Sequence, residues 1–137
     1  MKFVLPYPPS VNHYYRRVGP KTLISREGRA FRRNVRTLLG SGGQKPPFTG
    51  GIALAMDAFP PDRRRRDLDN LLKSTQDSLA HAGAFEDDSL INLLVVRRCE
   101  SIPGGRLVVQ IDTFPLRRCP LCGNSYSQAE SEQSHDN

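Results

Sequence analysis

The residues with the clearest capacity for chemistry lie between positions 60 and 90. Four arginines at positions 63–66 are followed directly by Asp67 and Asp69, and a second acidic group, EDD, occupies residues 86–88. Arginine holds phosphate through its planar guanidinium, whereas a neighbouring carboxylate would repel it. Carboxylates become useful beside phosphate when they hold Mg²⁺, because the ion neutralises the phosphate charge. The pattern therefore indicates metal-dependent cleavage of a phosphodiester.

A helix between the two acidic groups would bring them to the same place. Lys73 lies one turn beyond Asp69 and would project from the same side, Gly83 is a natural C-terminal stop, and Phe85 can anchor the returning chain on the core. The aspartates could then converge at one end of this helix. Its buried stripe, at spacings of three and four, would comprise Leu68, Leu71, Leu72, Thr75, Leu79 and Ala82.

Each part of this motif also has a purely structural explanation. Asp67 can be the N-cap of the helix, and Asp69 a first-turn acid favoured by the helix dipole. Asp87 and Asp88 can form an exposed turn, Lys73 can belong to a surface ion pair, and the arginine run can be a solvated loop. All these features occur together in one stretch, and this coincidence favours a metal-dependent active site over the separate structural explanations.

With these elements in this order, the chain resembles the RusA family of Holliday junction resolvases. The resemblance covers roughly the first 113 residues. It rests on DRRRRDLDNLLK at residues 62–73, EDDS at 86–89, PPS at 8–10, Asn12, YYR at 14–16 and GGR at 104–106. It implies a small, homodimeric, Mg²⁺-dependent endonuclease that resolves four-way DNA junctions by paired nicks in recombination and repair, with Mn²⁺ as a substitute ion. Asp67, Asp69 and Asp88 match the family's catalytic aspartates, and Lys73 matches its functional lysine.

The resemblance also implies roles for these residues. The three aspartates would ligate one or two Mg²⁺ ions, and a water made more acidic there would attack the phosphate in line. Lys73 would stabilise negative charge on the phosphate or orient the carboxylates. Asp87 stands beside Asp88 and is an alternative ligand.

Aromatic and basic residues adjoin near the N-terminus, where stacking and phosphate contact suit nucleic acid. The alternative for each tyrosine is packing in the core with its hydroxyl hydrogen-bonded. His13 is expected to be a surface or hydrogen-bonded residue and not a metal ligand, because no second metal-type ligand stands at a useful spacing. The expected DNA-binding residues are Asn12, Tyr14, Tyr15, Arg16, Arg63, Arg64, Arg65 and Arg66.

A first long helix is predicted from Arg26 to Leu39, with Ser25 as its N-cap and Gly40 as its stop. Much of its outer face is arginine with little acidic compensation. A solvated face is the default, but phosphate would relieve the repulsion, and we expect the arginines of this helix to hold backbone phosphates. Residues 40–47 read as a flexible loop. The helix would bury Phe31, Val35, Leu38 and Leu39 and expose Arg29, Arg32, Arg33 and Arg36.

Four strands are predicted, at residues 2–5, 52–59, 90–99 and 106–114. The third is almost continuously apolar, which suggests burial on both faces, and the short turn at 101–105 suggests that the third and fourth form a hairpin. The fold class is therefore α+β, a single domain with a mixed sheet of about four strands and two main helices.

The chain has 137 residues, enough for one domain, and a formal net charge of +6, which suits a polyanion but does not require one. No apolar run is long enough to span a membrane, and the N-terminus does not resemble a signal peptide. An odd number of cysteines, three, argues for a reducing compartment. We expect a cytoplasmic protein.

Residues 115–137 form a polar tail, expected to be flexible, beyond a nuclease domain at 1–114. Within the tail, CPLCG at 119–123 looks like half of a zinc knuckle, and Cys119 and Cys122 from two chains could share one Zn²⁺.

A homodimer would match the two-fold symmetry of a four-way junction and offer two active sites. Two other functions stay open, a nuclease for other branched DNA and a non-catalytic junction-binding protein.

Overall fold

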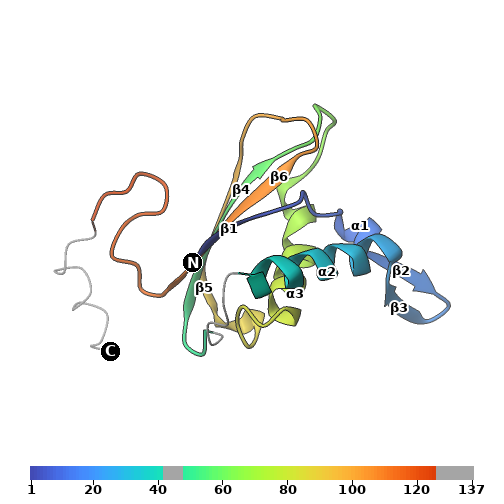
Figure 1. Ribbon diagram of the computed structural model, residues 1–137, viewed down its shortest axis with the longest axis horizontal. Helices are drawn as coiled ribbons and strands as arrows, with labels where there is room; N and C mark the ends of the chain where they lie inside the picture. The colour runs from blue at the N-terminus through green and yellow to red at the C-terminus, as the bar shows by residue number, and fades with distance from the viewer. Residues whose placement is uncertain (42–47, 126–137) are drawn as a thin grey trace.

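A four-stranded mixed sheet organises the chain (Figure 1). The computed structural model describes residues 1–41 and 48–125; most of the predicted loop at 40–47 and the tail beyond 125 lie outside them. The strands are β1 (Lys2–Leu5), β4 (Ile52–Phe59), β5 (Ile91–Arg98) and β6 (Arg106–Thr113), in the order β1-β6-β4-β5. Strand β5 runs parallel to β4, and the other pairs are antiparallel. The predicted α+β class, with one domain and about four strands, is confirmed.

The predicted hairpin between the third and fourth strands is wrong, because β4 lies between β5 and β6. The chain leaves β4 through a helix before it forms β5, and such a crossover places β5 parallel to β4. The connection from β5 to β6 then passes the end of β4. Along it, Cys99 N donates to Ala58 O at 2.8 Å and Ile102 N donates to Pro60 O at 2.9 Å.

Strand β5 is an edge strand, so the prediction that it is buried on both faces is also wrong. None of its residues is fully buried, and Leu94 is 38 % exposed. Strand β4 is one of the two interior strands, and its residues Ile52, Leu54 and Met56 are almost wholly inaccessible. An apolar run therefore did not distinguish a central strand from an edge strand.

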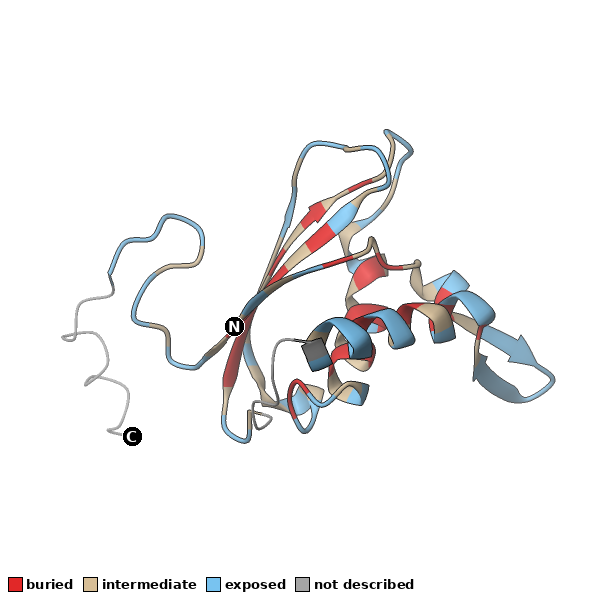
Figure 2. Ribbon diagram, viewed as in Figure 1, coloured by how far each residue is buried: buried red, intermediate tan, exposed pale blue. Residues whose placement is uncertain are grey.

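Two main helices, α2 (Arg26–Ser41) and α3 (Leu72–His81), pack against each other and against the sheet (Figure 1). Figure 2 shows that buried residues occur both on these helices and along the strands of the sheet. Phe31 and Val35 of α2 and Leu79 of α3 enter one core with the sheet, as predicted, whereas Leu38, predicted to be buried, is 41 % exposed. Phe85, 1 % exposed, anchors the chain after α3. Within the described residues, no helix combines the length and apolar character needed to cross a membrane.

The ends of the helices agree with the sequence in two of the three predicted cases. Ser25 caps α2 by accepting a hydrogen bond from Gly28 N at 3.0 Å. Gly83 ends the segment after α3 with φ +82°, and the bonds from Gly83 N to Ala80 O and from Ala84 N to Leu79 O, both 3.0 Å, form a Schellman motif. Gly40 does not take such a conformation, so α2 continues to Ser41 instead of stopping there.

The N-terminal aromatic segment forms a short helix and a hairpin that the sequence did not predict. Helix α1 (Val11–Tyr14) leads into β2 (Tyr15–Val18), which pairs with β3 (Lys21–Ile24). Tyr14 is 0 % exposed, and its hydroxyl lies 3.1 Å from Ser78 Oγ on α3. The expectation that Tyr14 stacks on DNA is therefore corrected, because its ring belongs to the core.

Candidate active site

A cavity of about 820 Å³ separates the N-terminal loop from the arginine-aspartate motif. We call it the motif cavity. Its two walls come from segments some sixty residues apart in the chain, and both carry sequence-predicted residues. The lining residues are Tyr7, Pro8, Pro9, Ser10, His13, Arg64, Arg65, Arg66, Asp67, Asn70 and Leu71.

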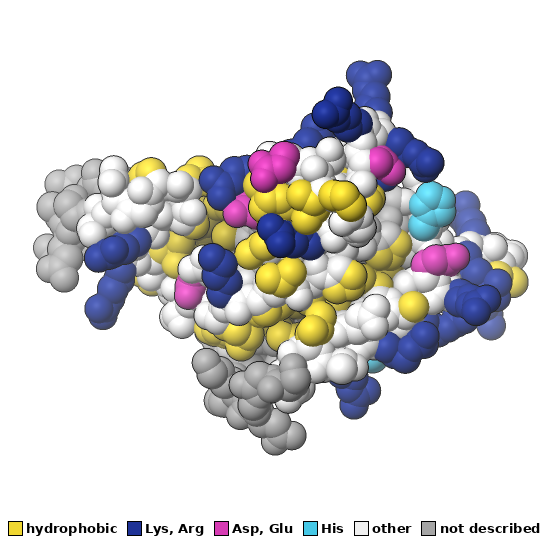
Figure 3. Space-filling view, turned by 45° about the horizontal axis from the view of Figure 1, so that its top comes forward, with side chains coloured by type: hydrophobic (Ala, Val, Ile, Leu, Met, Phe, Trp, Pro, Cys, Tyr) yellow, Lys and Arg dark blue, Asp and Glu magenta, His cyan; other side chains and the backbone are white. Residues whose placement is uncertain are grey.

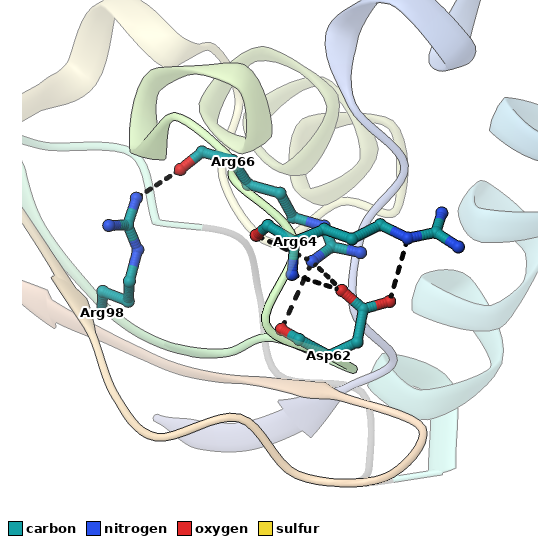
Figure 4. A network of polar contacts seen from close by, with 4 residues as sticks. All are labelled: Asp62, Arg64, Arg66 and Arg98. Atoms are coloured by element: carbon teal, nitrogen blue, oxygen red, sulfur yellow. Dashed lines mark hydrogen bonds and ion pairs between the residues drawn. The ribbon is translucent and has the colours of Figure 1, made fainter.

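Asp62 fixes the conformation of the arginine run (Figure 4). Its Oδ1 accepts hydrogen bonds from Arg64 N at 2.9 Å and from Arg66 Nη1 at 2.6 Å. The Arg66 bond, more than any other contact, lowers the pKa of Asp62 to about 2. Arg98, at the end of β5, donates to Arg66 O. The run is therefore a braced loop.

The four arginines differ in the number of hydrogen bonds and ion pairs that their side chains make within the protein. Arg66 is held by Asp62 and lies 5.9 Å from the centre of the Tyr7 ring, and Arg64 Nε is a loose 3.8 Å from Asp62 Oδ2. The exposed side chains of Arg63 and Arg65 make no hydrogen bond or ion pair to the residues described. Arg63 and Arg65 are thus free to meet phosphate, the Arg64 side chain is held only by its long ion pair with Asp62, and Arg66 holds the loop.

Asp67 and Asp69 stand at the start of the short helix η1 (Leu68–Leu71), and both are exposed. Asp67 occupies the N-cap position, but its side chain makes no capping hydrogen bond. Neither carboxylate has a hydrogen bond or ion pair within the described part of the chain. The explanation of Asp67 as a helix cap therefore lacks its defining contact.

The second acidic group precedes and begins η2 (Asp88–Leu90), which packs beside α3. Ser89 Oγ donates to Asp87 Oδ2 at 2.5 Å, and this bond, above all, lowers the pKa of Asp87. Asp88 is half-buried, and its charge helps to raise the pKa of Lys73. Asp87 thus has a local hydrogen-bond partner in Ser89, whereas the charge of Asp88 acts on Lys73, which favours Asp88 as the ligand.

Lys73 belongs to a small network that the sequence analysis missed. Its Nζ donates to Asp77 Oδ1 at 3.0 Å, and this bond is the main reason that the pKa of Lys73 is raised. Tyr15, on the hairpin, donates its hydroxyl to the other oxygen of Asp77, and burial followed by this bond raises the pKa of Tyr15. Asp77 could have been found from its i,i+4 spacing to Lys73.

The remaining predicted DNA-binding residues lie beside the motif cavity or on the hairpin. Asn12 and His13 are exposed on α1, and His13 Nδ1 lies 2.9 Å from Ser10 Oγ. Arg16 is exposed on β2. Tyr15 is half-buried, with its ring 4.7 Å from that of Tyr14, so only part of it is accessible.

The donor set fits magnesium in kind, since it consists of carboxylate oxygens, two of them exposed and without internal partners. Among the described residues, no three His, Cys, Asp or Glu side chains lie together as a ready metal cage, so the three predicted aspartates are not gathered into one. Mg²⁺ commonly keeps several waters and uses one or two carboxylates together with substrate phosphate. The residues can therefore hold the ion without such a cage.

The CPLCG sequence of the tail forms a closed turn. Cys119 N donates to Asn124 O at 2.8 Å, Gly123 N donates to Cys119 O at 2.9 Å, and Gly123 has φ +76°. Arg118 and Ser125 form a β-bridge across the turn. The shared zinc site stays a prediction.

Comparison with known proteins identifies relatives for most of the chain. The family model described as Endodeoxyribonuclease RusA matches residues 6–112. A crossover junction endodeoxyribonuclease of Enterobacteria phage HK97 is 43 % identical over 110 residues, which are 80 % of this chain and 92 % of the relative. The proteins of the same name from Enterobacteria phage 82 and Escherichia coli (strain K12) are 39 % and 38 % identical over 107 residues, 78 % of this chain and 89 % of each relative.

Proposed function

This chain belongs to the RusA family of endodeoxyribonucleases, and from that premise we propose that it resolves four-way DNA junctions by paired, Mg²⁺-dependent nicks in recombination and repair. The relatives that bear the name crossover junction endodeoxyribonuclease are matched over about nine-tenths of their length. The family resemblance expected from the sequence is confirmed by the match.

One observation carries the proposal for the site. Asp67 and Asp69 are exposed, lack partners within the described residues, and directly follow the braced arginine loop. Beside DNA phosphates, bare carboxylates would only repel the substrate. When bound there, Mg²⁺ supplies charge neutralisation and a more acidic water.

The chain's own residues then have distinct tasks. The carboxylate oxygens of Asp67, Asp69 and Asp88 serve as ligands, and Arg64 and Arg65 hold the DNA backbone. Lys73, kept by Asp77 within electrostatic reach of Asp88, places positive charge beside the carboxylates. This electrostatic attraction supports a role for Lys73 in orienting the carboxylates, and stabilisation of charge on the phosphate is its second candidate role.

We propose that the working form is a homodimer, because two opposed strands must be nicked and a two-fold dimer offers two equivalent sites. Light scattering should give twice the chain mass at concentrations where cleavage is observed. A monomer mass under those conditions would contradict the proposal.

The decisive experiment compares a synthetic four-way junction with linear duplex of the same sequence, with Mg²⁺, with Mn²⁺ and with EDTA. We expect symmetric nicks in the junction only when a divalent ion is present. Equal cleavage of a fork or a flap would favour the nuclease for other branched DNA. Tight junction binding without cleavage in any ion would favour the non-catalytic binder.

A further inference from the structure

A second hollow, which we call the arginine groove, lies away from the motif cavity. It measures about 630 Å³ and is bordered by residues 22–24 of β3, by four arginines of α2 and by His81 at the end of α3. None of its lining residues is acidic, and none lines the motif cavity. In Figure 3, Lys and Arg side chains predominate at the end of the molecule where α2 meets the hairpin.

The four arginines are placed on one face of α2 by their spacing, at positions 29, 32, 33 and 36. Arg29 Nη1 donates to Ile24 O at 2.8 Å, and Arg32 Nε donates to the Tyr14 hydroxyl at 2.5 Å, so these two tie the helix to the hairpin and the core. The exposed side chains of Arg33 and Arg36 have no hydrogen bond or ion pair within the described residues.

Repulsion among these arginines destabilises the helix unless an anion binds between them. Like charges three and four residues apart on a helix destabilise it, and in the groove no carboxylate offsets them. A row of guanidiniums suits an anion with regularly spaced charges, which is what a DNA strand offers. An isolated small anion would leave much of the row unmatched.

We propose that the arginine groove binds the phosphate backbone of the DNA arm that leads away from the cleavage site. This inference rests on the proposed function and adds a contact remote from the scissile phosphate. Arg33 and Arg36 are the principal residues that contact phosphate. Arg32 is held in place in the groove by its hydrogen bond to the Tyr14 hydroxyl.

Helix α3 sets the spacing between the two surfaces. Leu71, just before α3, lines the motif cavity, and His81 at its other end borders the groove. Ten helical residues separate them by about 15 Å. At about 3.4 Å per nucleotide along one strand, the groove should meet phosphates roughly four to five nucleotides from the one that is cut.

The test uses four-way junctions and linear duplexes in which three consecutive phosphates are replaced by uncharged methylphosphonates. The neutral block is moved along each strand, and affinity is measured in EDTA so that no cleavage occurs. Wild-type protein should lose affinity when the block lies roughly four to five nucleotides from the mapped nick. The variant R33Q/R36Q should be insensitive to that block, and the slope of its log affinity against log salt should be smaller by about 2.

The matched control is K2Q/R117Q, which removes the same charge from exposed positions outside both hollows. It should stay sensitive to the block. If R33Q/R36Q responds to the block as the control does, or if no block at that distance weakens wild-type binding, the inference is wrong. The comparison of salt slopes on linear duplex needs no mapped nick, so it reports on the groove even if junction cleavage itself is not observed.

Discussion

The motif cavity and the arginine groove both present arginine to the solvent, but only the first combines it with carboxylates. Beside the motif cavity, Asp62 holds the loop while Asp67 and Asp69 remain without internal partners. Among the described residues that line the groove, none is acidic. A surface of one sign can only attract a polyanion, whereas a surface of both signs can position a cation against it. The arginine groove is therefore suited to holding DNA, and the motif cavity to cutting it.

The largest expected effect is loss of cleavage in Asp67→Asn, Asp69→Asn or Asp88→Asn. Each change removes an anionic metal ligand, and the rate should fall on the order of a thousandfold, about 4 kcal/mol of transition-state stabilisation. Junction affinity in EDTA should stay the same or rise, because repulsion of phosphate is removed.

Asp87→Asn is the matched control for that series, since Asp87 already accepts a bond from Ser89. It should cut at close to the wild-type rate. Near-normal cleavage by any of the other three folded variants would remove that residue from the site.

The next effect concerns Lys73 and the carboxylate that holds it. Lys73→Ala should lower the cleavage rate about a hundredfold while changing junction affinity little. Asp77→Asn keeps Lys73 but weakens the hydrogen bond that positions it, so the cleavage rate of this variant should fall less than that of Lys73→Ala. Single-turnover rates and affinities, measured side by side, test the order; a larger loss in affinity than in rate would assign Lys73 to binding.

A smaller effect is expected from Arg64→Ala or Arg65→Ala. Either should weaken junction binding and lower the slope of log affinity against log salt by about 1. Arg97→Ala is the control, because Arg97 is committed to Asp57 at 2.8 Å on the sheet. An unchanged slope in both loop variants would show that the loop does not contact phosphate.

The smallest effect should follow truncation after Phe114. The tail lies outside the family match, so the free energy of unfolding should change by no more than about 0.5 kcal/mol, and cleavage should persist. Loss of all activity in a soluble truncated protein would refute this. Elemental analysis of full-length protein tests the tail's other prediction: half a zinc per chain fits a shared site, and no zinc excludes it.

Local patterns predicted the elements well and their assembly less well. The four strands, both main helices, Ser25 as a cap and Gly83 as a stop follow from periodicity and capping chemistry, which act over a few residues. The strand order did not follow, because β4 separates β5 from β6 through contacts between segments remote in sequence.

The candidate site shows the same division. The arginine run and its aspartates stand in the sequence itself, but the burial of Tyr14 depends on α2 and α3 packing around it. The link from Tyr15 to Asp77 joins residues 62 positions apart, and no local pattern reveals it.

The brace on the arginine loop also has an entropic consequence. Ordering a free loop on binding costs about 1–2 kcal/mol for each residue whose backbone must be fixed. Asp62 and Arg98 hold much of this loop in place before DNA arrives, so little of that cost falls on the binding step. Removing Asp62 would delete a negative charge near the substrate and yet weaken its binding, since the loop would then have to lose its freedom each time it met DNA.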